Sequence, residues 1–457
     1  MTKEDKQFYK KVAILVLPIA AQNLINTGIS SIDVIMLGKV GEKVLSGASL
    51  GAQIQFIMSL ILFGLTSGAS VLMAQYWGKK DYHSIETVFG IAAKVAAVIS
   101  VIFMVAAFCF PGQLMTLFTK DKEVIEQGAK YLRIVSLSYP VNALTMVYLN
   151  SMRNLQKVVI ATVVYLASMI TNIIVNGILI FGLFGAPEMG IVGASIGTLL
   201  ARIVEFIIVV VYDQKINDVF RFRWEYLFRK NSDLWKDFLN YSAPVVANEL
   251  MWGLGMSTMA AILGHMGSAA TAANSVAQVG RNLATVVAFG VASAAAIMIG
   301  NTIGEGKTEL ARSYGKKFIG LSVVTGALGG VLILLLRPFI LTTMELSDEA
   351  RNTLSFMLLL MAFYVVAQAV NTTLIVGIFR GGGDTRFGFF LDVSIMWGVA
   401  IVGGALAAFV FNAPLFVVIA FLLCDEEIKI PISLLRYRTY KWLRNVTREE
   451  VSESKEG

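Results

Sequence analysis

The stretch Ile35-Met-Leu-Gly-Lys-Val-Gly41 recurs, 226 residues later, as Ala261-Ile-Leu-Gly-His-Met-Gly267. The same displacement places Phe63-Gly-Leu-Thr-Ser-Gly68 over Phe289-Gly-Val-Ala-Ser-Ala294. Self-similarity at a fixed displacement is the signature of an internal repeat. We therefore expect the chain to consist of two related halves.

The duplication extends beyond these two segments. Pro18 aligns with Pro244 at a displacement of 226, and Arg153 aligns with Arg380 at 227. Chance does not hold a register over so long a stretch with one residue of slippage. The repeat therefore covers most of the chain.

The residues around both copies are too apolar for a water-soluble protein. Of the 457 residues, 56% are hydrophobic and 15% are charged, whereas soluble domains carry about 25% charged residues. A helix needs about 20 apolar residues to cross a bilayer, and these runs are continuous rather than alternating. We therefore expect an all-α polytopic membrane protein. Its twelve expected spans are 12–37, 50–77, 85–110, 129–152, 158–184, 189–212, 236–263, 276–302, 313–336, 352–379, 386–411 and 414–436.

Each half holds an even number of helices, six, so both halves enter the membrane from the same side. This arrangement predicts two parallel repeats related by a pseudo-two-fold axis along the membrane normal, a design found in transporters. We expect a first lobe at 1–212, a cytoplasmic linker at 213–235, a second lobe at 236–445 and a cytoplasmic tail at 446–457. Transport is the leading interpretation.

The basic residues indicate the orientation. Lys and Arg are in roughly threefold excess on the side of the N-terminus when the connections between the spans are compared. We therefore expect both termini in the cytoplasm, and a location in the inner (plasma) membrane. The isoelectric point of 9.2 then reflects topology, and no nucleic-acid partner is expected. We expect a monomer in the lipid bilayer.

Several other function classes lack their sequence signals. The chain has no GxxxxGK[ST], HExxH or GxSxG motif, so neither ATP-driven pumping nor intramembrane hydrolysis is indicated. Two cysteines, Cys109 and Cys424, cannot form a zinc site or a disulfide framework. We expect no enzymatic activity, no cofactor and no bound metal beyond a coupling ion.

Five segments occur in a characteristic order along the chain. They are Pro18 followed by Asp33, Ala74-Gln-Tyr-Trp-Gly-Lys-Lys-Asp81, Asn172-Ile-Ile-Val-Asn176, Phe181-Gly-Leu-Phe-Gly-Ala-Pro-Glu-Met-Gly-Ile-Val-Gly193 and Arg380-Gly-Gly-Gly-Asp-Thr385. In this order they resemble the multidrug and toxic compound extrusion (MATE) transporters. The resemblance covers about residues 10 to 445 and implies an antiporter that expels amphipathic, often cationic compounds in exchange for inward H⁺ or Na⁺.

Asp33 is the strongest candidate for the coupling residue. Charge at bilayer depth is costly and usually marks a pathway or relay, and burial favours the neutral carboxyl, which can then take up and release a proton. Asn172 and Asn176 are four residues apart and share a helix face. The resemblance implies that this face meets Asp33, that Thr198 joins the site, and that Asn176, an aspartate in some relatives, weakens the case for Na⁺. The alternative is an ion pair with a lysine such as Lys94.

The second lobe carries a different set of acids. The residue that aligns with Asp33 is Met259, whereas Glu249 follows Pro244 by five residues. The resemblance implies that Glu249 could bind a cation, a proton or a cationic drug, and Trp252 could stack on an aromatic substrate. Ordinary hydrogen bonding and packing remain the alternatives.

Three of the other charged residues within the expected spans, Arg202, Glu205 and Asp392, are possible site residues. Arg202 and Glu205 are three apart on one helix face and can pair, which suits a structural role or a relay. Asp392 has no obvious partner in the sequence, and a position facing a cavity and a structural role are both open for it. The runner-up function is a lipid-linked oligosaccharide flippase of the same superfamily. A flippase needs a strongly basic cavity, whereas the charges expected inside this membrane region are mostly acidic.

Overall fold

The computed structural model describes residues 3–219, 221–229, 231–344 and 346–448, and within these ranges the regular structure is helical. Helices satisfy their own backbone hydrogen bonds, as a lipid environment requires. The first half contains α1 (Lys3–Val40), α2 (Glu42–Lys79), α3 (Tyr82–Cys109), α4 (Pro111–Thr116), α5 (Lys122–Val135), a 3₁₀ turn (Ser136–Ser138), α6 (Tyr139–Asn154), α7 (Val159–Phe181), a second 3₁₀ turn (Leu183–Gly185) and α8 (Ile191–Lys215).

The second half repeats this order after the short α9 (Glu225–Phe228). π-helical segments, which are rare in proteins, follow α13, α14 and α15. The elements are α10 (Ser232–His265), α11 (Ser268–Gly304), α12 (Thr308–Thr343), α13 (Asp348–Thr372) with the π segment Thr373–Phe379, α14 (Thr385–Ile395) with Met396–Ile401, α15 (Val402–Ala405) with Leu406–Val410, α16 (Leu415–Leu422) and α17 (Asp425–Arg438).

The chain is a multi-pass membrane protein with twelve spans across its described residues. Nine of its helices are long and apolar enough to cross a bilayer by length and composition. Two other spans, expected as single helices at 129–152 and 414–436, are each built from two helices, α5 with α6 and α16 with α17. The twelfth span to be accounted for is α10, the first long helix of the second half, which has polar residues along its first half.

The first two helices are longer than the apolar pattern predicts. α1 and α2 each have 38 residues, or about 57 Å of helix, against a hydrocarbon core of about 30 Å. Gly41 separates α1 from α2 with φ +157°, and Gly267, its counterpart in the repeat, separates α10 from α11 with φ +125°. Glycine tolerates such values at little cost. The repeated motif therefore ends the first helix of each half.

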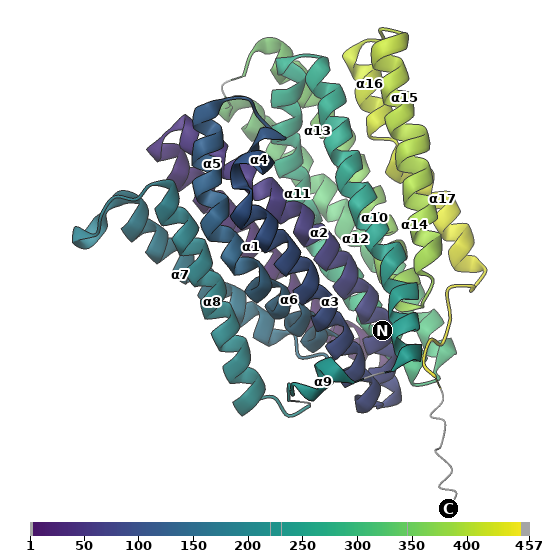
Figure 1. Cartoon of the computed structure of the whole chain (residues 1–457). Helices are drawn as coiled ribbons and strands as arrows, with labels where there is room; N and C mark the ends of the chain where they lie inside the picture. Colours follow the sequence, from purple (N-terminus) through teal and green to yellow (C-terminus); the bar gives the residue numbers. More distant parts are fainter. Residues whose placement is uncertain (1–2, 220, 230, 345, 449–457) are drawn as a thin grey trace, which may run out of the picture.

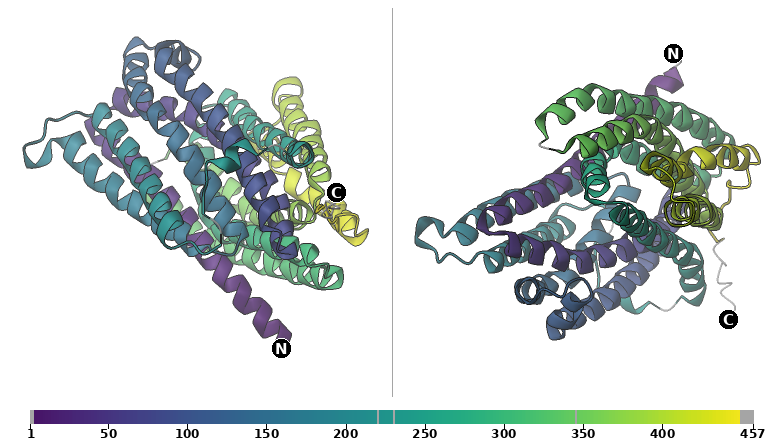
Figure 2. Two further views of the ribbon diagram at one scale, coloured as in Figure 1. Left: turned by 60° about the horizontal axis from the view of Figure 1, so that its bottom comes forward. Right: turned by 90° about the horizontal axis from the view of Figure 1, so that it is seen from above.

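The two halves lie side by side, and the start of α1 and the end of α17 are at the same end of the bundle (Figures 1 and 2). Helices α2 and α11 pack closely at this end. A Cβ on Gly78 would lie 2.0 Å from the Asn301 carbonyl oxygen, and one on Gly304 would lie 1.9 Å from that of Gln75. Gly78 and Gly304 occupy the same repeat position, so the duplication itself supplies the close contact between the halves.

The apolar core crosses the expected lobe boundary. Phe8 and Ile19 of α1 belong to a buried cluster with Val291 of α11 and Phe318 of α12. The first part of α1 therefore packs on the second half of the chain. The division at residues 212 and 236 stays a prediction based on sequence.

Candidate functional site

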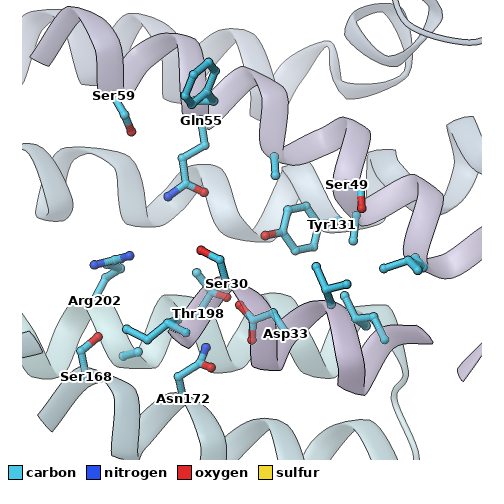
Figure 3. A pocket seen from close by; sticks show the side chains of 18 residues that line it. Ser30, Asp33, Ser49, Gln55, Ser59, Tyr131, Ser168, Asn172, Thr198 and Arg202 are labelled. Carbon is cyan, nitrogen blue, oxygen red and sulfur yellow. The ribbon is translucent and has the colours of Figure 1, made fainter. Parts of the chain in front are cut away.

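A cavity of about 430 Å³ lies within the first half, between α1, α2, α5, α7 and α8 (Figure 3). Ser30, Asp33, Asn172 and Thr198 gather on one side of it, and Gln55 and Tyr131 point toward them from across the cavity. The walls are otherwise mostly apolar. The remaining lining residues are Ile29, Val34, Leu37, Leu45, Ala48, Ser49, Ala52, Phe56, Ser59, Ser168, Ala201 and Arg202.

Asn176 connects the two parts of the polar cluster. Its Nδ2 donates to Oδ1 of Asp33 at 2.6 Å and to Oδ1 of Asn172 at 3.2 Å. Asn172 and Asn176 are buried, whereas Asp33 is half-buried and faces the cavity. The structure thus brings together Asp33, Asn172, Asn176 and Thr198, although their roles stay a prediction.

Gly197 on α8 makes room for Asn176. A Cβ at residue 197 would lie 1.9 Å from Oδ1 and 3.0 Å from Cγ of Asn176. Oδ1 of Asn176 is itself buried and accepts no hydrogen bond from the described residues. The amide of Asn176 is therefore held between α1 and α8, with its nitrogen toward the acid.

Arg202 and Glu205 form the expected pair on α8. The Arg202 Nη1 to Glu205 Oε1 distance is 2.6 Å, and the Glu205 side chain is fully buried. Arg202 also lines the cavity and lies close enough to interact electrostatically with Asp33. The pair therefore places a guanidinium, partly neutralised, beside the candidate acid. Lys94, the alternative partner for Asp33, instead lies over the ring of Trp235.

Sequence reasoning missed the residues that face Asp33 across the cavity. Tyr131 comes from α5, just after the charged Lys130, so nothing in the local pattern distinguishes it. Gln55 on α2 is a polar residue within an apolar run and was detectable on that ground. Ser30 precedes Asp33 by three residues and shares its helix face.

In the second half, Glu249 is paired. Its Oε1 accepts a hydrogen bond from Nη2 of Arg380 at 2.8 Å, and both side chains are nearly buried. Arg380 directly follows the span expected at 352–379, and its side chain is buried against Glu249 rather than exposed. The acids are therefore less dominant among the interior charges than the sequence suggested.

Asp392 also has partners, contrary to the sequence interpretation. Its Oδ2 accepts from Nδ2 of Asn248 at 3.0 Å, and its Oδ1 lies 3.2 Å from Nζ of Lys429. Lys429 also pairs with Asp425 at 2.9 Å and Glu426 at 3.1 Å. These partners lie far away in sequence, which is why the local pattern did not reveal them. Asp392 belongs to an internal ion-pair cluster.

The remaining residues expected in the second half lie in apolar surroundings. Met259, the counterpart of Asp33, is buried in an apolar cluster, and Trp252 packs against the same cluster. The position equivalent to Asp33 is therefore occupied by a buried apolar side chain.

Few side chains suit a metal ion. Among the described residues, no group of three His, Cys, Asp or Glu side chains is arranged to hold one. Near Asp33, a cation such as Na⁺ would need the oxygens of Asp33, Asn172 and Thr198 together, since hard cations require several oxygen ligands. However, the amide nitrogen of Asn176 points at two of these oxygens. This arrangement suits an ionised carboxylate better than a bound cation.

Comparison with known protein families identifies one family whose model matches both halves of the chain. A family model described as MatE matches the chain twice, at residues 18–178 and 244–406. The two matches begin 226 residues apart, which is the displacement of the internal repeat.

The similar proteins include one curated relative and several solved structures. The probable multidrug resistance protein YoeA of Bacillus subtilis is 22% identical over 405 residues, covering 87% of each chain. A MOP superfamily transporter from Pyrococcus furiosus has a TM-score of 0.85 at 17% identity, covering 94% of this chain and 95% of that one. A mutant of the Vibrio cholerae MATE transporter VcmN has a TM-score of 0.85 at 16% identity, covering 96% and 98%. At these identities, the solved structures show the shared fold.

Proposed function

Because the chain belongs to the MatE family, we propose that it is an antiporter that exports amphipathic, often cationic drugs and other xenobiotics by alternating access. The observation that carries this proposal is the half-buried Asp33 in a cavity of about 430 Å³. That volume is typical of small-molecule sites, which usually have apolar walls and a few polar groups. A carboxylate in such a place attracts cations.

We propose that the coupling ion, H⁺ or Na⁺, binds at Asp33, and the geometry favours the proton. The Nδ2 of Asn176 donates to the ionised carboxylate at 2.6 Å. When Asp33 takes up a proton, a half-turn of the Asn176 amide would let its oxygen accept that proton's hydrogen bond instead. Exchange then needs no cofactor besides the coupling ion.

The proposed setting follows from the charge distribution. We propose the inner (plasma) membrane as the location, with both termini in the cytoplasm, because the connections on that side carry more Lys and Arg. We further propose that the protein works as a monomer in the bilayer, with small amphipathic molecules as partners and no nucleic acid. A flippase is less well supported, because it needs a strongly basic cavity, and the buried Arg380 is neutralised by Glu249.

Transport by inverted membrane vesicles tests the proposal. Uptake of ethidium is expected under an imposed pH gradient and is expected to be lost in Asp33→Asn, which keeps the shape but cannot take up a proton. Asp348→Asn is the matched control, because Asp348 is an exposed residue at the start of α13. Uptake driven by a Na⁺ gradient alone would refute proton coupling. Full uptake in Asp33→Asn would refute the role of Asp33.

A further inference from the structure

A second cavity lies between the two halves, apart from the Asp33 site. It has a volume of about 70 Å³ and is bounded by α2 and α6 of the first half and by α11 and the end of the α13 span of the second. Phe63, one of its lining residues, is 42% exposed. Its polar lining residues are Ser67, Ser70, Asn150, Arg153, Asn154, Ser293 and Arg380.

The cavity is lined by residues that the repeat relates. Ser67 aligns with Ser293 at the displacement of 226, and Arg153 aligns with Arg380 at 227. Both members of each pair contribute to its walls. The cavity therefore lies on the pseudo-two-fold axis, where neither half alone could form it.

The two arginines are not equally neutralised. Arg380 pairs with Glu249 at 2.8 Å and donates to Ser67 of the opposite half at 3.1 Å. Arg153 donates to the neutral Gln22, its buried Nε has no hydrogen-bond partner, and within the described ranges no carboxylate lies at ion-pair distance from it. The side chains around the cavity thus carry one excess positive charge.

The neighbouring polar groups are arranged as hydrogen-bonding partners. Nδ2 of Asn150 and Nδ2 of Asn154 both donate to Oγ of Ser70, at 3.0 and 2.9 Å. An unneutralised guanidinium in a partly buried site is costly unless an anion meets it. Guanidinium groups bind carboxylates in a planar, two-pronged geometry.

We propose that this cavity is an anion subsite that binds the carboxylate of an exported amphiphile, with Arg153 as its main contact. The inference rests on the proposed export function and deepens it, because it extends the substrate class from cations to zwitterions. A single excess charge matches a monoanion such as a carboxylate rather than a dianionic phosphate. The small volume accommodates the anionic group, while the remainder of the molecule lies beyond Phe63.

The first experiment uses the wild-type protein and needs no transport. Purified protein is heated in the presence of benzoate, the neutral benzamide, or phosphate, each at the same concentration and ionic strength. Benzoate is expected to raise the unfolding midpoint above that in either other solute, because a ligand that binds the folded state stabilises it. An equal effect of benzamide, a larger effect of phosphate, or no effect of benzoate would overturn the proposal.

The second experiment locates the site. Arg153→Gln is expected to abolish the benzoate effect, whereas Arg153→Lys, which keeps the charge, is expected to retain part of it. Arg351→Gln, at an exposed arginine of α13, is the matched control and is expected to behave as wild type. A benzoate effect that persists in a folded Arg153→Gln protein would place the anion elsewhere.

The third experiment tests the substrate class with two matched dyes, rhodamine 110, which has a free carboxylate, and rhodamine 123, its methyl ester. Arg153→Gln is expected to weaken binding of rhodamine 110 about tenfold, the loss of one charge-assisted hydrogen bond, and to change rhodamine 123 less than about twofold. Equal changes for both dyes would refute the assignment to substrate carboxylates. Benzoate binding without binding of either dye would support the anion subsite and count against the proposed export function.

Discussion

Gly197→Ala is the sharpest test of the Asp33 site, because it adds one methyl group at a defined place. The new Cβ would lie 1.9 Å from Oδ1 of Asn176, whereas ordinary contacts begin at 3.4 Å. The amide must therefore move by about 1.5 Å, since a packed interior leaves no other space. Its hydrogen bond to Asp33, now 2.6 Å, would then lose its present geometry, because the amide nitrogen shifts together with the oxygen.

The expected loss has two parts. A hydrogen bond to a charged group contributes about 1.5–3 kcal/mol, which corresponds to a factor of about 10 to 150 in an equilibrium constant. Overpacking costs about 1–3 kcal/mol more. We therefore expect a lower midpoint of thermal unfolding and at least about a tenfold slower dye uptake driven by a pH gradient.

A neighbouring glycine supplies the control. Gly177 follows Asn176 on α7, and a Cβ there would meet no atom within 4 Å. Gly177→Ala should fold and transport as wild type. In the double variant Gly197→Ala with Asn176→Ala, the steric clash is relieved, so stability should recover while transport stays low. Wild-type uptake by Gly197→Ala would refute the link between this amide and coupling.

Three further predictions concern charged pairs. Arg202→Met leaves the fully buried Glu205 without its partner and should destabilise the protein by about 3 kcal/mol, whereas the double change of both residues to Met should recover most of the unfolding midpoint. Lys429→Met removes the cation shared by three carboxylates and should lower the unfolding midpoint, whereas Lys429→Arg, which keeps the charge, should lower it less; an equal loss in both variants would contradict this. A hydrogen bond from Lys157 holds the pKa of the Asp218 carboxyl below its usual range, so this pair stabilises the folded state above about pH 4 and ceases to as the pH falls. Replacing Asp218 by Asn should reduce the acid dependence of the midpoint slightly, since the pair is exposed, and an unchanged pH profile would show that it contributes nothing.

Much of the architecture was readable from the chain alone. Long apolar runs predict membrane helices, because a lipid-exposed backbone must satisfy its own hydrogen bonds. The repeated motif that ends at Gly41 and Gly267 predicted two related halves, and the turns form at these glycines. Helix breaks within spans were not predicted, since a broken span can be as apolar as a continuous one.

The Asp33 site was predictable in part. Asp33, Asn172 and Asn176 stand out as polar residues within apolar runs, and Asn172 and Asn176 share a helix face by spacing alone. The resemblance to a family supplied the contact between the two helices. Tyr131 was hidden, because its neighbours in sequence are charged and its role depends on the rotation of α5.

The sequence by itself determined that the chain is a duplicated helical membrane protein with few interior charges. The tertiary structure alone decided which of these charges meet. Glu249 pairs with Arg380, and Asp392 pairs with Lys429, and in each pair the two residues come from different helices. The apolar pattern of a helix reports how deep a residue lies, but the identity of its partner depends on how helices distant in sequence are rotated and packed against one another.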